Sequence, residues 1–140
     1  MPLRVRDTFF LSDTGGANNP AGAHLMVCIM VDAQNDTAII VPIVTQHQLS
    51  DTSCVLNVGD HPFIKRPSCA SYDFAQIISL SETNRQIEEK KIRLRRRVSD
   101  ELLIRLLVGF VSSDETVPRV FQAAHGQALI AGLKHRGHIR

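Results

Sequence analysis

Two long apolar runs around a short polar turn constrain the fold of this chain most strongly. Residues 24–31 and 37–44 are almost continuously apolar, and residues 32–36 between them have turn composition. Many of the apolar residues are β-branched, which favours strands, so the two runs predict a β-hairpin. Because the runs are apolar on both faces, we expect the two strands to lie in the middle of a sheet.

Shorter segments are expected to extend this sheet. Residues 9–11 and 53–58 have the length and composition of further strands. Residues 70–80 resume as extended chain, with three core candidates, Phe74, Ile77 and Ile78. Residues 12–23 are rich in Gly, Asn, Ala and Pro, and they predict a loop long enough to suspect a function.

The sequence period changes in the last third of the chain. Ser99 is a candidate N-cap, and the apolar residues after it recur at three- and four-residue spacing: Leu102, Leu103, Leu106, Leu107 and Phe110. A second helix is expected over residues 117–133, with its inward residues being Phe121, Ala124, Ala128 and Leu129. Strands followed by helices predict a single α+β domain over residues 1–140, with a small curved antiparallel sheet or barrel at 8–98 and helices at 99–134.

Basic residues are concentrated in a few places, although the 140 residues carry a net charge of only +2. Residues 92–98 partly alternate between apolar and basic side chains, which predicts a strand with one basic face formed by Arg93, Arg95 and Arg97. A local patch of this kind attracts phosphate even when the total charge is small. A solvated strand face, or a sheet edge protected by charge, explains the same pattern equally well.

The composition indicates an ordinary globular chain. Apolar residues make up 44% and charged residues 21%. No run approaches the roughly 18–20 apolar residues that a membrane-spanning helix needs. The first residues lack the apolar core of a secretory signal. We therefore expect a cytoplasmic protein that has no membrane partner.

Metal ligands and reactive thiols are sparse. The three cysteines match no zinc ribbon or CxxC pair, and Cys28 and Cys54 lie in apolar runs. His135 and His138 have i,i+3 spacing, but no carboxylate or cysteine follows to complete a metal site. We expect a protein without a metal or cofactor, and a small-molecule or metal site built on the histidines is the least favoured hypothesis.

The densest polar run is Gly59–Ser68, where two prolines stiffen the chain around three candidate binding residues, His61, Lys65 and Arg66. His24 opens one of the two long predicted strands, and Thr45 closes the other. Strand ends and rigid loops are where binding groups usually converge. In the simpler interpretation, which stays open, Thr45 satisfies a strand end and His61 caps a turn.

These residue types suit cleavage of RNA without a metal ion. The 2′-hydroxyl of RNA attacks its own phosphate, so the protein has to supply a base, an acid, and donors or cations for the developing charge. His has a suitable pKa for proton transfer near neutrality, while Arg, Lys, Ser and Thr supply charge and hydrogen bonds. Many binding sites share this composition, so it shows compatibility only.

Several short motifs form a pattern that is found in a known family. They are His24-Leu25, Val41–Thr45, Cys54-Val55-Leu56 leading into Gly59–Ile64, Ser68 with Tyr72, Phe74–Ile77 and Val98–Leu103. Together they resemble the PemK/MazF toxins, and in particular a divergent branch of that family. The resemblance covers roughly residues 8–113 and is strongest at Gly59–Ser68.

The resemblance implies an SH3-like barrel of bent antiparallel strands with C-terminal helices, usually as a homodimer. It also implies a toxin-like endoribonuclease that cleaves single-stranded RNA or mRNA without a metal ion and is inhibited by a small antitoxin protein. In that family the position of His24 generally carries Arg, and the position of Thr45 carries Thr or Ser.

Carried over to this chain, the resemblance gives four candidate catalytic residues, His24, Thr45, His61 and Ser68. Of these, the histidines would transfer protons, the threonine would position the phosphate and the serine would donate a hydrogen bond. The candidate RNA- and phosphate-binding residues are Lys65, Arg66, Arg93, Arg95 and Arg97.

The replacement of the usual Arg by His24 leaves three interpretations open. His24 takes over proton transfer, or Lys65 and Arg66 supply the missing cation, or the chain no longer cleaves RNA. The last interpretation is the alternative function: a non-catalytic SH3-like barrel module that binds nucleic acid or a protein partner.

Overall fold

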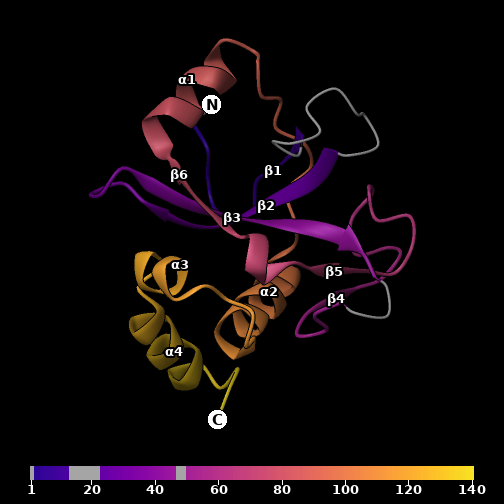
Figure 1. Cartoon of the computed structure of the whole chain (residues 1–140), viewed down its shortest axis with the longest axis vertical. Coiled ribbons are helices and arrows are strands. Elements are labelled where there is room, and N and C mark those ends of the chain that lie inside the picture. The colour runs from indigo at the N-terminus through magenta and orange to yellow at the C-terminus, as the bar shows by residue number, and fades with distance from the viewer. Residues whose placement is uncertain (1, 13–22, 47–49) are drawn as a thin grey trace.

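The computed structural model describes residues 2–12, 23–46 and 50–140, and it confirms the predicted α+β class. Figure 1 shows an antiparallel sheet between helix α1 on one side and helices α2, α3 and α4 on the other. The strands in these ranges are β1 (Thr8–Ser12), β2 (Ala23–Asp32), β3 (Thr37–Thr45), β4 (Val55–Leu56), β5 (Ser68–Ala70) and β6 (Gln76–Ser79). The helices are α1 (Leu80–Glu88), α2 (Asp100–Ser112), α3 (Pro118–Ala123), α4 (Gly126–His135) and the short 3₁₀ helix η2 (Tyr72–Phe74).

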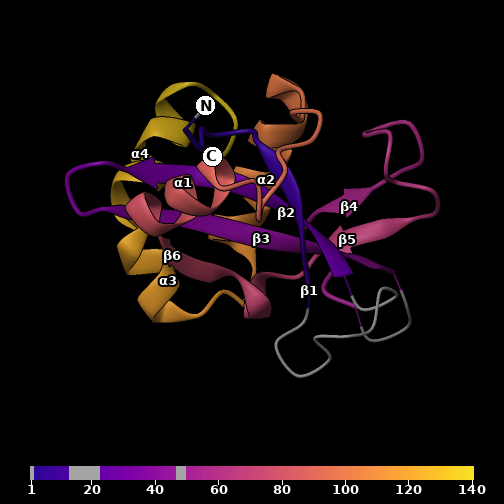
Figure 2. The same ribbon diagram turned by 90° about the horizontal axis from the view of Figure 1, so that it is seen from above.

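The hairpin of β2 and β3 confirms the strongest prediction from the sequence. The two strands pair antiparallel with Val27 opposite Val41, and a bulge lies between Cys28 and Met30. β3 is the most central strand, because β6 pairs with its first half and β5 with its last residues. In Figure 2 the hairpin runs from the side of α3 and α4 to the side of β4 and β5.

The sheet is open within the part of the chain that is described. Its strand order is β1-β2-β3-β5-β4, with β6 also beside β3, and no strand pair there joins β1 to β4. The closed SH3-like barrel therefore stays a prediction. The loop expected at residues 12–23 lies outside the described ranges except at its two ends, and the strand expected at 53–58 covers only Val55–Leu56.

Both faces of the central hairpin are buried, which explains its continuous apolar sequence. On one face Val27 and Ile39 pack with residues of α2, α3 and α4. On the other face Met26 and Ile40 pack with Phe9 of β1 and with partly buried residues of α1. Successive residues of one strand thus belong to two separate cores.

Helix α2 begins where the sequence predicts it. Ser99 Oγ accepts a hydrogen bond from Leu102 N–H at 3.0 Å. The fully buried Tyr72 donates its hydroxyl hydrogen to Leu106 C=O at 2.7 Å, and burial raises the pKa of Tyr72 well above its ordinary value. Gly109 faces this hydroxyl so closely that a Cβ would collide with it, which accounts for a glycine inside the helix.

The last predicted helix is in fact two helices, α3 and α4, because the chain turns at His125. His125 has a left-handed backbone with φ of 55°, and Gly126 lies against the ring of Phe121, where no Cβ fits. The prediction that Ala128 points inward is wrong because it is exposed, whereas Ala124 is fully buried as expected. None of the helices in the described ranges is long and apolar enough to cross a membrane.

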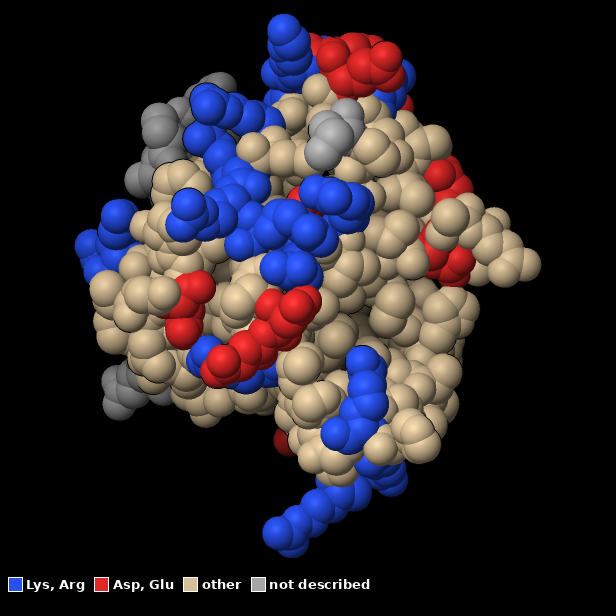
Figure 3. All heavy atoms as spheres, turned by 180° about the vertical axis from the view of Figure 1, so that it is seen from behind, with Lys and Arg blue, Asp and Glu red and all other residues tan. Residues whose placement is uncertain are grey.

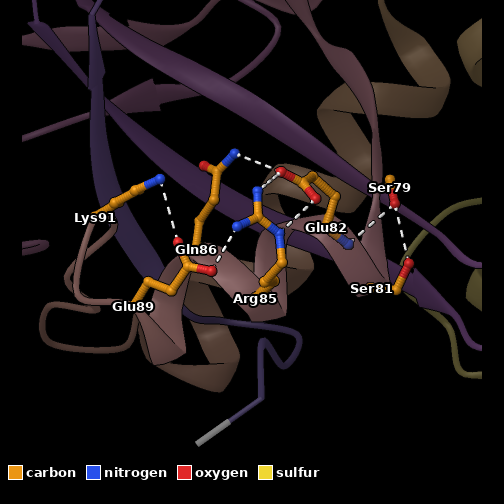
Figure 4. Close-up of polar contacts among 7 residues, drawn as sticks. All are labelled: Ser79, Ser81, Glu82, Arg85, Gln86, Glu89 and Lys91. Atoms are coloured by element: carbon orange, nitrogen blue, oxygen red, sulfur yellow. Dashed lines mark hydrogen bonds and ion pairs between the residues drawn. The ribbon is translucent and has the colours of Figure 1, made fainter.

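Helix α1 is missed by the sequence interpretation because it carries few apolar residues. The overlooked signal is the spacing of Ser79 and Glu82, which matches a capping box. Ser79 Oγ accepts Glu82 N–H at 3.1 Å, and the Arg85 guanidinium lies between the carboxylates of Glu82 and Glu89, as Figure 4 shows. Lys91 pairs with Glu89 at 3.2 Å. Capping and charge pairs therefore support this polar helix.

The segment expected to be extended at residues 70–80 is interrupted. It contains the end of β5, the helix η2 and β6. Phe74 is wrong as a core candidate because it is 68% exposed in η2, whereas Ile77 and Ile78 pack against the two cores from β6.

Candidate nucleic-acid interface

Residues 92–98 do not form the predicted strand, but run as an extended segment along β1. One isolated bridge joins the segment to Thr8, and Val98 N–H donates to Arg6 C=O at 3.0 Å. Its carbonyl groups accept side-chain donors: Thr8 Oγ1 reaches Arg96 C=O at 2.7 Å, and Arg6 Nε reaches Val98 C=O at 2.7 Å. These side chains replace part of the hydrogen-bond ladder of a regular strand.

His61 connects the polar run Gly59–Ser68 to this extended segment. It is 4% exposed, its Nε2 lies 2.6 Å from Arg96 C=O, and its Nδ1 accepts a hydrogen bond from Phe63 N–H at 3.2 Å. Because a backbone N–H can only donate, Nδ1 is the acceptor and the ring proton lies on Nε2. Both ring nitrogens are used inside the protein, so in this structure His61 acts as a bridge between two segments.

A group of cations lines one hollow of about 550 Å³ between the N-terminal residues and the segment that follows α1. We call these residues the basic face: Arg4, Lys90, Arg93, Arg95 and Arg97. The same hollow is also lined by three apolar side chains, Ile87, Ile92 and Leu94. Figure 3 shows a band of Lys and Arg side chains gathered across one side of the molecule.

One buried carboxylate lies beneath the basic face. Asp7 is 2% exposed, accepts Arg4 N–H at 2.8 Å and pairs with Arg97 Nε at 3.5 Å. Arg97 also donates from its guanidinium to Val5 C=O at 2.7 Å. Arg97 is therefore partly neutralised, whereas no carboxylate of the described ranges pairs with Arg4, Lys90, Arg93 or Arg95.

A second hollow, of about 500 Å³, adjoins the first at Arg97, which lines both. Its lining also includes residues 58–62, Ile64, Lys65 and Arg96. Lys65 and Arg66 are both exposed. Arg97 therefore places the basic face next to the predicted polar run, and each hollow also contains one carboxylate in its lining, Asp7 in the first and Asp60 in the second.

Two partly exposed phenylalanines lie against the same segments. Phe10 is 38% and Phe63 is 40% exposed, and their ring centroids are 5.0 Å apart with an interplanar angle of 76°. The guanidinium carbon of Arg95 lies 5.7 Å from each ring centroid. We call Phe10, Phe63 and Arg95 the aromatic platform. Exposed aromatic rings beside cations are typical of surfaces that bind single-stranded nucleic acid.

Three of the predicted catalytic residues lie at one end of the sheet, but on two different faces. Thr45 pairs with Ser68 and lies on the face of Ile43, which packs in the core beneath α2. His24 lies on the face of Met26, which packs in the other core. Residues directly opposite in a sheet share a face, and neighbours along a strand do not. The register therefore sets His24 apart from Thr45 and Ser68.

The surroundings of these three residues also differ. Thr45 is exposed, His24 is half-buried, and Ser68 is buried with its hydroxyl donating to Arg66 C=O at 2.9 Å. In contrast to His61, the His24 ring has no hydrogen bond to any residue within the described ranges. The backbone of Gln46 donates to Pro67 C=O at 3.0 Å, which places the polar run beside the end of β3.

The sequence interpretation misses the aromatic platform and one cation of the basic face, Arg4, whereas Lys90 belongs to the basic block that the sequence shows at residues 90–97. The exposure of Phe10 follows from its position beside Phe9. In a half-buried strand only one of two consecutive residues faces the core, and here that residue is Phe9, which is 1% exposed. Phe63 is the only aromatic residue in a run that is otherwise mainly polar. Arg93, Arg95 and Arg97 line one hollow, but no strand places them there, and Ile92 and Leu94, which were expected on the opposite side, line the same hollow.

Metal ligands and reactive thiols do not contribute to this surface. Among the residues that the structure describes, no group of three or more His, Cys, Asp or Glu side chains could hold a metal ion. Cys28, Cys54 and Cys69 are free and buried, and burial raises the pKa of the Cys28 thiol to about 12.

The chain has no match among protein-family models, curated proteins or solved structures. The resemblance to PemK/MazF toxins therefore rests on the sequence motifs alone. The structural evidence on function is the basic face and the aromatic platform beside it.

Proposed function

We propose that this chain binds single-stranded RNA in the cytoplasm, and that it does so across the basic face. The observation that supports this most strongly is the basic face, in which Arg4, Lys90, Arg93 and Arg95 have no carboxylate partner in the described ranges. Cations that replace the counterions of phosphate supply much of the affinity of proteins for nucleic acid. A local surface suffices for this purpose even though the net charge is only +2.

The arrangement of charges and apolar surface favours RNA over a simple acidic partner. Apolar residues line the first hollow together with the cations, and the aromatic platform shares Arg95 with the basic face. An extended nucleic acid presents both phosphates and bases, so it matches cations and aromatic rings together. His61 joins the polar run to the extended segment at residues 92–98, and this contact holds the residues that line the two hollows together.

A toxin-like endoribonuclease that needs no metal ion is the second candidate function. It is favoured by the exposed Thr45, which pairs with Ser68 at the end of the sheet. The polar run that contains Lys65 and Arg66 ends at Ser68 and therefore lies beside Thr45. In this candidate Thr45 positions the phosphate and the cations stabilise the developing charge. His24, the predicted base or acid, lies on the opposite face of the sheet from Thr45, which makes this candidate the weaker of the two. An SH3-like barrel, a homodimer and a small antitoxin partner belong to the same proposal.

One experiment separates the two functions. Purified protein is incubated with a mixed pool of labelled RNA in EDTA, and the products are run on native and denaturing gels. A shifted complex with intact RNA supports the binding function, and defined cleavage products support the endoribonuclease. If the RNA neither shifts nor breaks, both functions are wrong.

A further inference from the structure

The aromatic platform is a feature that binding to phosphates does not require. Its two rings meet edge to face, and each remains more than one third exposed. Arg95 lies over both rings and at the same time lines the hollow of the basic face. The platform therefore adjoins the basic face and leaves part of each phenylalanine exposed to a ligand that reaches it.

His61 holds Phe63 in position from within the protein. The two rings lie 5.6 Å apart and are tilted by 32°, while His61 Nδ1 accepts the Phe63 backbone N–H. His61 is in turn fixed to Arg96 C=O, and that carbonyl also accepts Thr8 Oγ1. An exposed ring that is anchored in this way loses little conformational entropy when a ligand stacks on it.

We propose that the aromatic platform stacks one unpaired nucleobase of a bound RNA strand. This inference rests on the proposed RNA-binding function and adds a subsite to it. Two nearby cations bind the phosphates that flank the stacked base: Arg93, which lines the first hollow together with Arg95, and Lys65, which lines the second. In a duplex the base faces are covered by neighbouring pairs, so the subsite selects single strands.

The first test compares a short oligouridylate with an abasic RNA of the same length, which has the same phosphates but no bases. Wild-type protein should bind the oligouridylate about ten-fold or more tightly than the abasic strand. Phe63→Ala should abolish this difference and leave the affinity for the abasic strand unchanged. The matched control is Phe74→Ala, which removes a more exposed phenylalanine in η2 and should keep the full difference.

Fluorescence gives a second, independent test. The chain contains no tryptophan, so Phe63→Trp introduces a single reporter at the platform. Its emission should be quenched by oligouridylate but not by the abasic strand or by inorganic polyphosphate. Emission from Phe74→Trp should not change with any of the three ligands.

The outcomes distinguish this inference from the function on which it rests. If wild-type protein binds oligouridylate and the abasic strand equally in a salt-sensitive manner, the stacking subsite is wrong and RNA binding stands. The same conclusion follows if polyphosphate quenches the Phe63→Trp emission as strongly as oligouridylate does. If neither RNA binds, the proposed function itself is wrong.

Discussion

The two sides of the sheet are covered in different ways. On the side of α2, α3 and α4 the contacts are apolar, and Leu106, Phe110 and Leu133 are completely buried there. On the other side, α1 and the segment 92–98 cover the sheet, and the segment is fixed by hydrogen bonds while its arginine side chains line a hollow. The comparison indicates that stability resides mainly on the side of α2, α3 and α4, the helical side. The proposed RNA binding belongs to the other side, the basic side.

We expect the largest loss of stability from a substitution on the helical side, Phe110→Ala. Phe110 is fully buried and packs between Tyr72 and Phe121, with ring centroids 6.0 Å and 6.3 Å away. Removal of a buried phenylalanine ring lowers the free energy of unfolding by about 3–5 kcal/mol. Urea denaturation measures this loss, and RNA affinity of the folded variant should not change. A loss below about 1 kcal/mol would contradict the assignment of stability to this side.

On the basic side we expect substitutions to weaken RNA binding and to leave the stability almost unchanged. Lys90→Glu combined with Arg93→Glu reverses two exposed charges and should weaken binding of oligouridylate by about 10- to 100-fold. The free energy of unfolding should change by less than about 0.5 kcal/mol, since both side chains are exposed. The matched control is Arg119→Glu with Lys134→Glu on α3 and α4. Equal loss of affinity in both double variants would show that overall charge, not the basic face, determines binding.

His61→Ala tests the connection between the polar run and the extended segment. The substitution leaves the Phe63 N–H without its acceptor and removes a buried ring, so we expect a loss of about 1–3 kcal/mol in the free energy of unfolding. Selectivity for oligouridylate over the abasic strand should fall as well, because Phe63 loses its support. If His61 is instead a catalytic residue only, the variant would lose RNA cleavage while its denaturation midpoint stays at the wild-type value.

The smallest effect concerns pH and the outer surface of α1. Hydrogen bonds from Arg85, and then from Gln86, lower the pKa of Glu82 from 4.5 to about 2. Since the folded pKa lies below the unfolded one, Glu82 stabilises the protein above about pH 4.5, and this stabilisation is lost as the pH falls toward 2. The carboxylate is exposed, so the effect is small.

Thermal melting between about pH 5 and pH 2 measures this effect. The melting temperature of Glu82→Gln should fall less over this range than that of the wild type. Glu88→Gln, at an exposed position of the same helix, serves as the control and should follow the wild type. If Glu82→Gln also follows the wild type, the ion pair between Glu82 and Arg85 contributes nothing to stability.

The central strands and α2 could be predicted because local signals agreed with burial there. The two apolar runs correctly predicted the β2–β3 hairpin, and the spacing of apolar residues after Ser99 correctly predicted α2 with its cap. Helix α1 was missed because a capping box and charge pairs, rather than an apolar face, support it. The prediction of a strand at 92–98 is wrong. The side chains of Thr8 and Arg6 donate hydrogen bonds to two carbonyl groups of this segment, so those carbonyl groups do not pair with the backbone of a neighbouring strand.

The candidate site was predictable in part. Arg93, Arg95 and Arg97 line one hollow, although without the predicted strand or its separate apolar face, and Lys65 lines the adjoining hollow. The roles of His61 and His24 depended on contacts between distant segments, which spacing along the chain does not reveal. Only the register could show that His24 and Thr45 face opposite sides of the sheet.

The most direct test of the basic face is the affinity for oligouridylate measured by fluorescence anisotropy over a series of salt concentrations. We predict that the logarithm of the affinity falls linearly with the logarithm of the salt concentration. In the Lys90→Glu, Arg93→Glu variant the slope should be smaller by about one for each phosphate contact that is removed. An affinity that does not depend on salt, or a slope that is the same in the variant and the wild type, would contradict binding of RNA across this face.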